Sequence, residues 1–204
     1  GYGVDTQHIA QIGTPTGHAI IAVDREAENQ IILFPGANRA VTHDQLEQAL
    51  TQAEAGDILV MQNETNMQAE AAEMARNLGL RVAYAAAPFD AAAVQAVLPY
   101  LDLLFLNEVE AQQLQQAGGK APQDLGVAHV IVTLGDKGAR HFDGGTGQIT
   151  DIPALSVTPV DTTGAGDTFM AAHIAAEARG EDRQAALSSA LQAAATYVSG
   201  EPPL

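Results

Sequence analysis

Residues 160–169 read VDTTGAGDTF and lead into a strongly helical stretch of the chain. The Gly164-Ala165-Gly166 core predicts a tight turn whose backbone can approach a ligand without side-chain hindrance. The helix that follows presents unpaired N–H groups and the positive end of its dipole at this turn, an arrangement that commonly binds phosphate. Asp167 falls in the first helical turn, where a carboxylate can accept a proton from a hydroxyl that attacks a phosphate. The pattern suits phosphoryl transfer, but for this motif alone an ordinary helix cap is the more common explanation, because Asp and Thr are frequent at helix starts. The rest of the chain has to decide between the two.

Before this turn, short apolar runs alternate with helical patterns. Buried strands are predicted at residues 58–61, 80–84, 103–106 and 130–134. Helices are predicted between them at 67–78, 91–98 and 108–117, and two Ala-rich helices are predicted at 165–179 and 183–198. Repeated strand–helix–strand units with fully apolar strands are typical of a parallel sheet covered on both faces, so the sequence predicts a single α/β domain.

Two further pairs of strands are predicted to form hairpins. Residues 19–23 and 30–34 are β-branched runs separated by a polar segment. Residues 139–142 and 148–152 flank a Gly-Gly pair, and we expect this second hairpin at one edge of the sheet. Thr42 is predicted to cap a helix whose apolar positions run at helical spacing as far as Ala53.

The composition limits the classes of function. The chain has 204 residues, 47% hydrophobic and 17% charged, which suits one globular domain. With 9 Lys and Arg against 25 Asp and Glu, its net charge of −16 would repel nucleic acid, anionic membranes and free ATP, so a nucleotide would have to arrive with Mg²⁺. No apolar run is long enough for a membrane helix, and no secretory signal is visible. The lack of cysteine fits a cytoplasmic protein.

Two other kinds of site are not indicated. The six His residues show no metal-ligand spacing, and His141 and His173 are interpreted as packing or surface residues. No G-x-x-x-x-G-K-[ST] motif occurs, which excludes a Walker-type ATPase.

Polar groups follow three of the predicted strands at the same end. Gln62-Asn63-Glu64 comes after one strand, the segment 107–110 after another, and Thr133-Leu134-Gly135 after a third. Because ligands bind where the carboxyl ends of parallel strands meet, we expect these groups to form one active site.

The run at 160–169 resembles the signature of the ribokinase family, the phosphofructokinase-B type of sugar kinases. Other segments similar to successive ribokinase segments, in family order, are Gly3–Thr6, Thr14–Asp24, Phe34–Asn38, Asn107–Ala111 and Val132–Ala139. This resemblance implies a ribokinase-like three-layer α/β/α fold with a mainly parallel central sheet and a lid hairpin. It also implies that residues 1–204 are a kinase domain truncated at its N-terminus, in which residues 14–36 are a remnant of the lid.

The resemblance assigns roles to the residues around the Gly-Ala-Gly turn. Asp167 matches the general base that takes the proton from the sugar's primary hydroxyl, and it also contacts the sugar. The N–H groups of Gly164, Ala165, Gly166 and Asp167 match the anion hole for the transferred phosphoryl group. Asp161 and Thr163 match a loop that binds a monovalent cation, usually K⁺, and Thr163 and Gly166 also border the ATP. Residues 199–202, where the family completes the cation site, depart from the usual family pattern.

Further roles fall on the strand ends. Asn107 and Glu110 match a pair that orders Mg²⁺ and the phosphates of ATP, largely through water, but their spacing also suits an ordinary helix start. Thr133 and Gly135 match positions that line the nucleotide, with a plain strand-ending turn as the alternative. Glu64 matches an acidic position that contacts the sugar, and its alternative is a solvated loop carboxylate.

The resemblance therefore implies an ATP-dependent kinase that phosphorylates the primary hydroxyl of a sugar and forms a homodimer through its lid. Phe34–Asn38 and Thr14–Gly17 favour ribose as the acceptor. A fructose, tagatose or keto-deoxy-gluconate type of sugar, or a nucleoside, is the alternative acceptor. A non-catalytic nucleotide- or sugar-binding fragment is the alternative from another class, since the family's main sugar-gripping groups lie upstream of the region that Gly3 begins.

Overall fold

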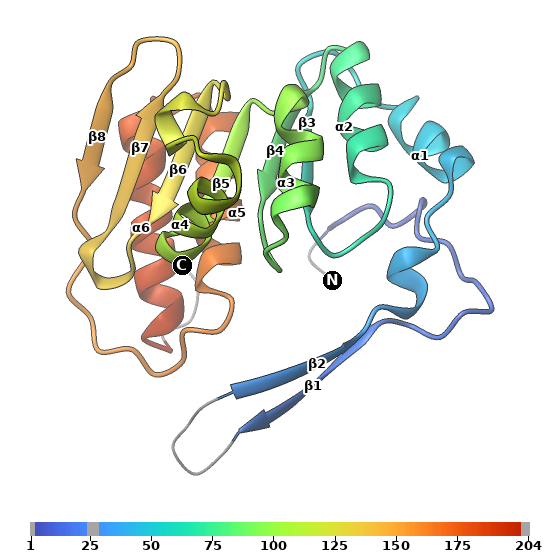
Figure 1. The fold of residues 1–204 in the computed structure, drawn as a ribbon, viewed down its shortest axis with the longest axis horizontal. Helices are drawn as coiled ribbons and strands as arrows, with labels where there is room; N and C mark the ends of the chain where they lie inside the picture. Colours follow the sequence, from blue (N-terminus) through green and yellow to red (C-terminus); the bar gives the residue numbers. More distant parts are fainter. Residues whose placement is uncertain (1–2, 24–28, 201–204) are drawn as a thin grey trace.

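The computed structural model of the chain describes residues 3–23 and 29–200 (Figure 1). Its central sheet has six strands, which in spatial order are β3 (Ile58–Gln62), β4 (Arg81–Ala85), β5 (Leu103–Asn107), β6 (His129–Thr133), β7 (Ala139–Asp143) and β8 (Ile149–Ile152). Strands β3 to β6 pair in parallel, whereas β7 pairs antiparallel with β6 and β8 antiparallel with β7. The predicted mainly parallel sheet with a hairpin at one edge is confirmed.

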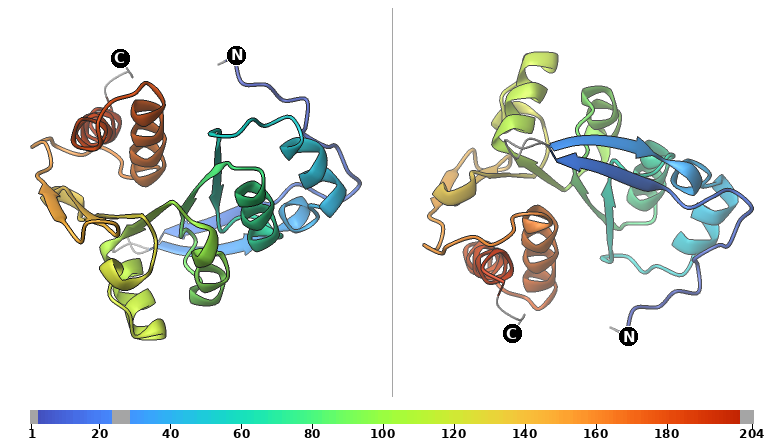
Figure 2. Two further views of the ribbon diagram at one scale, coloured as in Figure 1. Left: turned by 90° about the horizontal axis from the view of Figure 1, so that it is seen from above. Right: turned by 90° about the horizontal axis from the view of Figure 1, so that it is seen from below.

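Helices cover both faces of this sheet (Figure 2). One layer contains α1 (His43–Leu50), α2 (Gln68–Asn77), α3 (Ala91–Val97) and α4 (Glu108–Gly118), and the other contains α5 (Ala165–Ala178) and α6 (Arg183–Val198). Short 3₁₀ turns lie at Gly36–Arg39, Leu98–Tyr100, Pro122–Asp124 and Gly135–Lys137. Within the described ranges, none of the helices is long and apolar enough to cross a membrane. The three-layer α/β/α arrangement is confirmed.

Strand β5 illustrates why the sheet is covered on both faces. Leu104 and Leu106 pack into the core beneath the first helical layer, whereas Leu103 and Phe105 pack into the core beneath α5 and α6. All four residues are at most 5% exposed. Because side chains alternate along a strand, an apolar run without polar positions buries its side chains only when both faces are covered.

The element boundaries follow local chemistry. Thr42 Oγ1 accepts the Gln45 N–H at 3.3 Å, and the Gln45 side chain accepts the Thr42 N–H at 2.9 Å, so a capping box starts α1 at the predicted place. Helix α1 ends at Leu50, and Ala53 therefore lies beyond it, which corrects the predicted helical position. Strands β3 and β5 extend one residue farther than predicted, and their last residues are Gln62 and Asn107.

The predicted first hairpin consists of β1 (His18–Val23) and β2 (Asn29–Phe34) and lies beyond the edge where the parallel strands end (Figure 1). Its polar turn, residues 24–28, lies outside the described residues. Gly36 is required at the base of the hairpin, because it has a φ of +48° and a Cβ there would lie 2.3 Å from the Pro15 carbonyl oxygen. The Ala37 N–H donates to that carbonyl at 2.8 Å. These contacts hold the hairpin where it leaves the domain.

Glu177, near the end of α5, joins the starts of β4 and α6. Its carboxylate lies 2.7 Å from Arg81 Nη2 and 3.0 Å from Arg183 Nη2, and His173 Nε2 is 3.4 Å away. The Glu177 side chain is only 7% exposed. Burial by itself would raise the pKa of Glu177, but the contacts with His173, Arg81 and Arg183 outweigh it and lower the pKa to about 2. The ionised carboxylate therefore stabilises the folded chain.

We expect Glu177→Gln to lower the free energy of unfolding at pH 7 by about 2–4 kcal/mol, because it leaves two partly buried guanidinium groups without the buried carboxylate that pairs with both. Because the pKa of Glu177 is lower in the folded chain than its unfolded-state value of 4.5, the charged carboxylate stabilises the folded chain fully above pH 4.5. This stabilisation is lost as the pH falls from 4.5 toward 2. The difference between variant and wild type should therefore shrink over that range. Urea denaturation at pH 7, 4 and 3 measures it, with Glu73→Gln, on the exposed side of α2, as the control. Equal stability of Glu177→Gln and wild type at pH 7 would contradict the assignment.

Candidate active site

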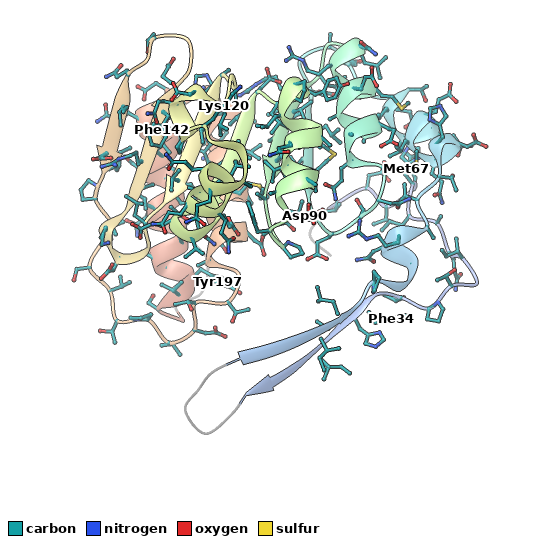
Figure 3. The ribbon with its side chains drawn as sticks, viewed as in Figure 1. Phe34, Met67, Asp90, Lys120, Phe142 and Tyr197 are labelled. Atoms are coloured by element: carbon teal, nitrogen blue, oxygen red, sulfur yellow. The ribbon has the colours of Figure 1, made fainter. Side chains whose placement is uncertain are left out.

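The start of α5 is built around Gly164. This residue has a φ of +81°, and a Cβ there would lie 3.1 Å from the hydroxyl of Tyr197, which marks this end of α6 in Figure 3. The Ala165 N–H donates to the Thr162 carbonyl at 3.1 Å and closes the turn. Among residues 3–23 and 29–200, the N–H groups of Gly166 and of Asp167 find no acceptor. Two N–H groups without an acceptor and the positive end of the helix dipole are the features with which helix starts commonly bind anions.

Asp167 extends from this helix start toward the sheet. Its Oδ1 accepts a hydrogen bond from the side-chain amide of Gln62, the last residue of β3. Asp167 is exposed, and Gln62 is half-buried. The contact joins two residues 105 positions apart and holds the carboxylate at the rim of the sheet. Gln62 was expected at this rim but was given no role from the sequence.

Glu64 lies on a loop that Asn63 holds in place. Asn63 is 6% exposed, and its side chain donates to the Pro88 carbonyl at 2.8 Å and accepts from the Gln68 amide at 2.9 Å. Glu64 is exposed and borders a cavity of about 260 Å³ between this loop and the base of the hairpin. The hairpin side of the cavity is lined by Gly17, His18, Ala19, Leu33, Phe34, Pro35, Asn38 and Arg39, of which Phe34 is labelled in Figure 3.

Asn107 and Glu110 start α4 with a reciprocal cap. Asn107 Oδ1 accepts the Glu110 N–H at 2.8 Å, and Glu110 Oε2 accepts the Asn107 N–H at 2.8 Å. Burial raises the pKa of Glu110, and the Asn107 N–H partly opposes this rise. In the described part of the chain, Glu110 Oε1 has no hydrogen-bond donor. The helix-start interpretation is confirmed, and this free oxygen leaves the ligand interpretation open.

Thr133 and Gly135 lie at the end of β6. Thr133 pairs with Asn107 across the parallel strands, which places the two predicted nucleotide residues side by side. Gly135 turns the chain with a φ of +61° and borders a cavity of about 580 Å³. The other walls of this cavity come from residues 154–159, the start of α5 and one side of α6, and include Thr162, Ala165, Leu191, Ala194, Ala195 and Val198. A cavity of this size suits a small-molecule ligand.

The part played by α6 was not predicted from the sequence. Its apolar and Ala-rich pattern indicates packing, and no polar residue in that pattern points to a ligand. The cavity arises because α6 lies beside the loop 154–159 and the turn at Gly135.

Asp161 precedes the anion-binding turn. Hydrogen bonds from the N–H and the hydroxyl of Thr163, the former at 2.8 Å, lower the pKa of Asp161. The N–H groups of Val160 and Asp161 donate to the Val198 carbonyl at 2.7 and 3.3 Å, which ties the loop to the end of α6. The family resemblance places the last part of a cation site at residues 199–202. The structure describes Ser199 and Gly200, whereas residues 201–204 lie outside the described residues.

The predicted site residues thus gather at one edge of the sheet, in two groups. In the first group Gly135 and Ala165 line the larger cavity, and Asn107 and Thr133 lie side by side at the ends of β5 and β6. In the second group Glu64 lines the smaller cavity, beyond the end of β3. Asp167 belongs to the helix start that borders the first group, and its contact with Gln62 reaches the second. The carboxylates of Glu110, Asp161 and Asp167 are each bonded to a different donor.

The fold is a three-layer α/β arrangement in which the start of α5, with two N–H groups that have no acceptor among the described residues, lies between two cavities. The chain matches the description "pfkB family carbohydrate kinase" over residues 1–201. It therefore belongs to the pfkB family of carbohydrate kinases.

Individual relatives agree with this assignment. The chain is 34% identical over 180 residues to ribokinase from Haemophilus influenzae, a match that covers 82% of this chain and 58% of that protein. It is 27% identical over 213 residues to deoxyribokinase from Salmonella typhi, covering 98% of this chain and 69% of that protein. The solved structure of Arabidopsis thaliana ribokinase complexed with ribose and ATP is 30% identical and has a TM-score of 0.76, covering 91% of this chain and 64% of that one. The chain spans only part of the length of these relatives.

Two glycine substitutions should separate stability from anion binding. Gly164→Ala is expected to lower the free energy of unfolding by about 1–2 kcal/mol, because an L-residue is strained in the left-handed region. Gly166→Ala should not lower it, since no atom lies within 4 Å of a Cβ there and alanine is the better helix former. That Cβ should instead crowd an anion at the free N–H groups and weaken Mg²⁺–ATP binding by about tenfold, the equivalent of one charge-assisted hydrogen bond.

Urea denaturation and calorimetry with Mg²⁺–ATP measure the two effects. If Gly166→Ala bound the nucleotide as wild type does, the first turn of α5 would not be the phosphate site.

Proposed function

We propose that this protein is an ATP-dependent sugar kinase that transfers the γ-phosphate of ATP to the primary hydroxyl of a sugar, with ribose as the favoured acceptor. The position of Asp167 carries the proposal. It lies in the first turn of α5 beside two free N–H groups, and its carboxylate reaches the end of β3, next to the loop of Glu64. This position sets a base between an anion site and a polar cavity.

The nucleotide is assigned to the larger cavity. Gly135, Thr162 and Ala165 border it, and the Asn107–Thr133 pair lies at the adjoining strand ends. The start of α5 forms one wall, so a nucleotide held there would direct its phosphates to the Gly166 and Asp167 N–H groups. The Arabidopsis relative, whose solved structure contains ribose and ATP, supports both ligands.

The acceptor sugar is assigned to the side of Asp167 that faces Gln62 and Glu64. Gln62 occupies Asp167 Oδ1 and leaves Oδ2 to accept the proton of the sugar hydroxyl. As that proton moves to Oδ2, the hydroxyl oxygen bonds to the γ-phosphorus, and the bond from this phosphorus to the bridging oxygen of ADP breaks. The free N–H groups of α5 stabilise the charge on the transferred group, each such contact contributing about 2–4 kcal/mol.

Two cations are assigned from the available oxygens. Glu110 Oε1 fits Mg²⁺ held largely through water, since Mg²⁺ keeps several of its water ligands. Asp161, whose lowered pKa keeps it ionised, fits a monovalent cation together with Thr163. When bound, the Mg²⁺ would neutralise charge on the ATP phosphates, which this acidic chain does not do itself.

The acceptor sugar is the part of this function that an assay of several sugars decides. The polar side chains that line the cavity beside Glu64 suit sugar hydroxyls in general, and the relatives include a deoxyribokinase as well as ribokinases. Deoxyribose is therefore tested beside ribose, fructose, tagatose, keto-deoxy-gluconate and a nucleoside in one ATP-coupled assay. ATP binding without turnover on any of them would favour a non-catalytic binding module.

The first hairpin supports a homodimer. Ile20 and Ile32 are cross-strand partners, each 58% exposed, and Phe34 is 47% exposed with its ring 5.0 Å from that of its partner, His18. These residues form one apolar face on a two-stranded sheet, an arrangement that is marginal in water by itself. Packing of this face against a second copy would bury it.

Asp167→Asn should preserve Mg²⁺–ATP binding and lower kcat by about 10²–10⁴-fold, the usual contribution of a general base. The amide oxygen can still accept from Gln62, so the position of the side chain is kept. Steady-state kinetics with ribose measures kcat, and calorimetry measures nucleotide binding. The control is Asp124→Asn, at an exposed residue of the 3₁₀ turn Pro122–Asp124. Near wild-type turnover would remove Asp167 from the mechanism.

Glu110→Gln should raise the Mg²⁺ concentration needed for half-maximal rate and leave the KM for the sugar little changed. The neutral amide can still accept the Asn107 N–H, so α4 keeps its cap while the charge that attracts Mg²⁺ is lost. Rates measured over a Mg²⁺ series at saturating ATP test this. A changed KM for the sugar with unaltered Mg²⁺ dependence would place Glu110 in the acceptor half of the site.

A further inference from the structure

Two histidines and an aspartate meet where β6 begins and β7 ends, at the end of these strands that is opposite to the candidate active site. His129 is the first residue of β6, and the antiparallel register pairs it with Asp143 of β7. His141 lies two residues before Asp143, and therefore on the same face of the strand. Figure 3 labels Phe142, which lies between His141 and Asp143 in the sequence, and shows it at the opposite end of the strands from Tyr197.

The ligand atoms of these residues lie close enough to share an ion. His129 Nδ1 is 3.2 Å from His141 Nε2 and 4.0 Å from Asp143 Oδ2, and all three atoms lie within 4.8 Å of one another. Ligand atoms bound to Zn²⁺ at about 2.0–2.2 Å in a tetrahedral arrangement are separated by about 3.4 Å. Small side-chain torsions bridge the difference, because the His129 and Asp143 side chains are partly exposed, at 22% and 26%.

The surrounding structure positions these ligands. Asp143 Oδ1 accepts the N–H groups of Gly145 and Thr146 at 2.9 and 2.8 Å, which leaves Oδ2 on the side of His129. His141 is 5% exposed, so its ring is fixed by packing.

A cavity of about 370 Å³ borders His129, one of the three residues, and is large enough to hold water beside an ion bound there. Carboxylates outnumber guanidinium groups there: Asp102, Glu177 and Glu181 line it with Arg81 and Arg183. Both arginines are paired with Glu177, which reduces their repulsion of a cation.

We propose that His129, His141 and Asp143 form a binding site for a divalent transition-metal ion, with Zn²⁺ as the best match and one position open to water from the adjacent cavity. Two neutral rings carry two N–H protons between them, one of which lies between His129 Nδ1 and His141 Nε2. On binding, that proton moves to the other nitrogen of the ring that donates it, so both facing nitrogens offer a lone pair to the ion and no proton is released. Two imidazoles and one carboxylate suit Zn²⁺ and disfavour Mg²⁺, which prefers oxygen ligands.

The proposed ion would act away from the candidate active site. His129 and Thr133 are the two ends of β6, about 13 Å apart along a five-residue strand. The ion would join β6 to β7, where the sheet changes from parallel to antiparallel pairing. Its expected effect is on the stability of this edge of the sheet.

The test is a titration of the chelator-treated protein with Zn²⁺ by calorimetry and with Co²⁺ by visible absorption, in excess Mg²⁺. We expect one ion per chain at this site, an intense Co²⁺ absorption typical of four- or five-coordination, and a raised Tm with Zn²⁺. His129→Gln and Asp143→Asn should each weaken binding at least about tenfold, the effect expected for loss of a ligand interaction. His43→Gln, an exposed histidine at the start of α1, is the matched control and should bind as wild type does.

Asp143→Asn can still accept the turn N–H groups through its amide oxygen, and circular dichroism checks that each variant is folded. A third variant, His141→Gln, changes a buried residue and does not need to fold for the test to work. His129→Gln and Asp143→Asn change partly exposed residues, and they decide whether these side chains bind the ion. Absence of saturable Co²⁺ absorption in the wild type, or equal affinity in wild type and these two variants, would overturn the proposal and leave the rings as a hydrogen-bonded pair only.

Discussion

Parallel pairing of β3 to β6 is the constraint on which the rest of the structure depends. Because these four strands run in one direction, their carboxyl ends meet at one edge, and Gln62, Asn107 and Thr133 are the last residues of three of them. The apolar strands also require helices on both faces, and the second layer places the start of α5 at that edge. The contact between Gln62 and Asp167 follows from both requirements together.

Electrostatics explains why a backbone site suits this chain. With a net charge of −16, the protein as a whole repels phosphate, and carboxylates at the candidate site, among them Glu110, Asp161 and Asp167, add to that repulsion. The first turn of α5 opposes it locally with two N–H groups and a helix dipole, neither of which depends on basic side chains. Gly164 is central because its left-handed conformation, packed against Tyr197, starts the helix at the required place.

Helix capping and ligand binding use the same residues at this edge. Asn107 and Glu110 close a capping box on α4, and Asp161 accepts the Thr163 N–H at the turn before α5. Each carboxylate has a second oxygen, so a structural hydrogen bond holds the side chain in place while the remaining oxygen is available to a cation or to water. A capping interpretation and a functional interpretation of these residues are therefore compatible.

Local patterns in the sequence were sufficient for the order of strands and helices, the two hairpins and the place of Asp167 in the first turn of a helix. Apolar periodicity, capping residues and glycine turns act between neighbours in the chain, so they can be read without the fold. The tertiary structure alone decided the Gln62–Asp167 contact, the wall that α6 contributes to the larger cavity, and the meeting of His129, His141 and Asp143. Their spacing in the sequence carries no signal, because strand register and the packing of one helical layer bring them together across distances of 12 to 105 residues.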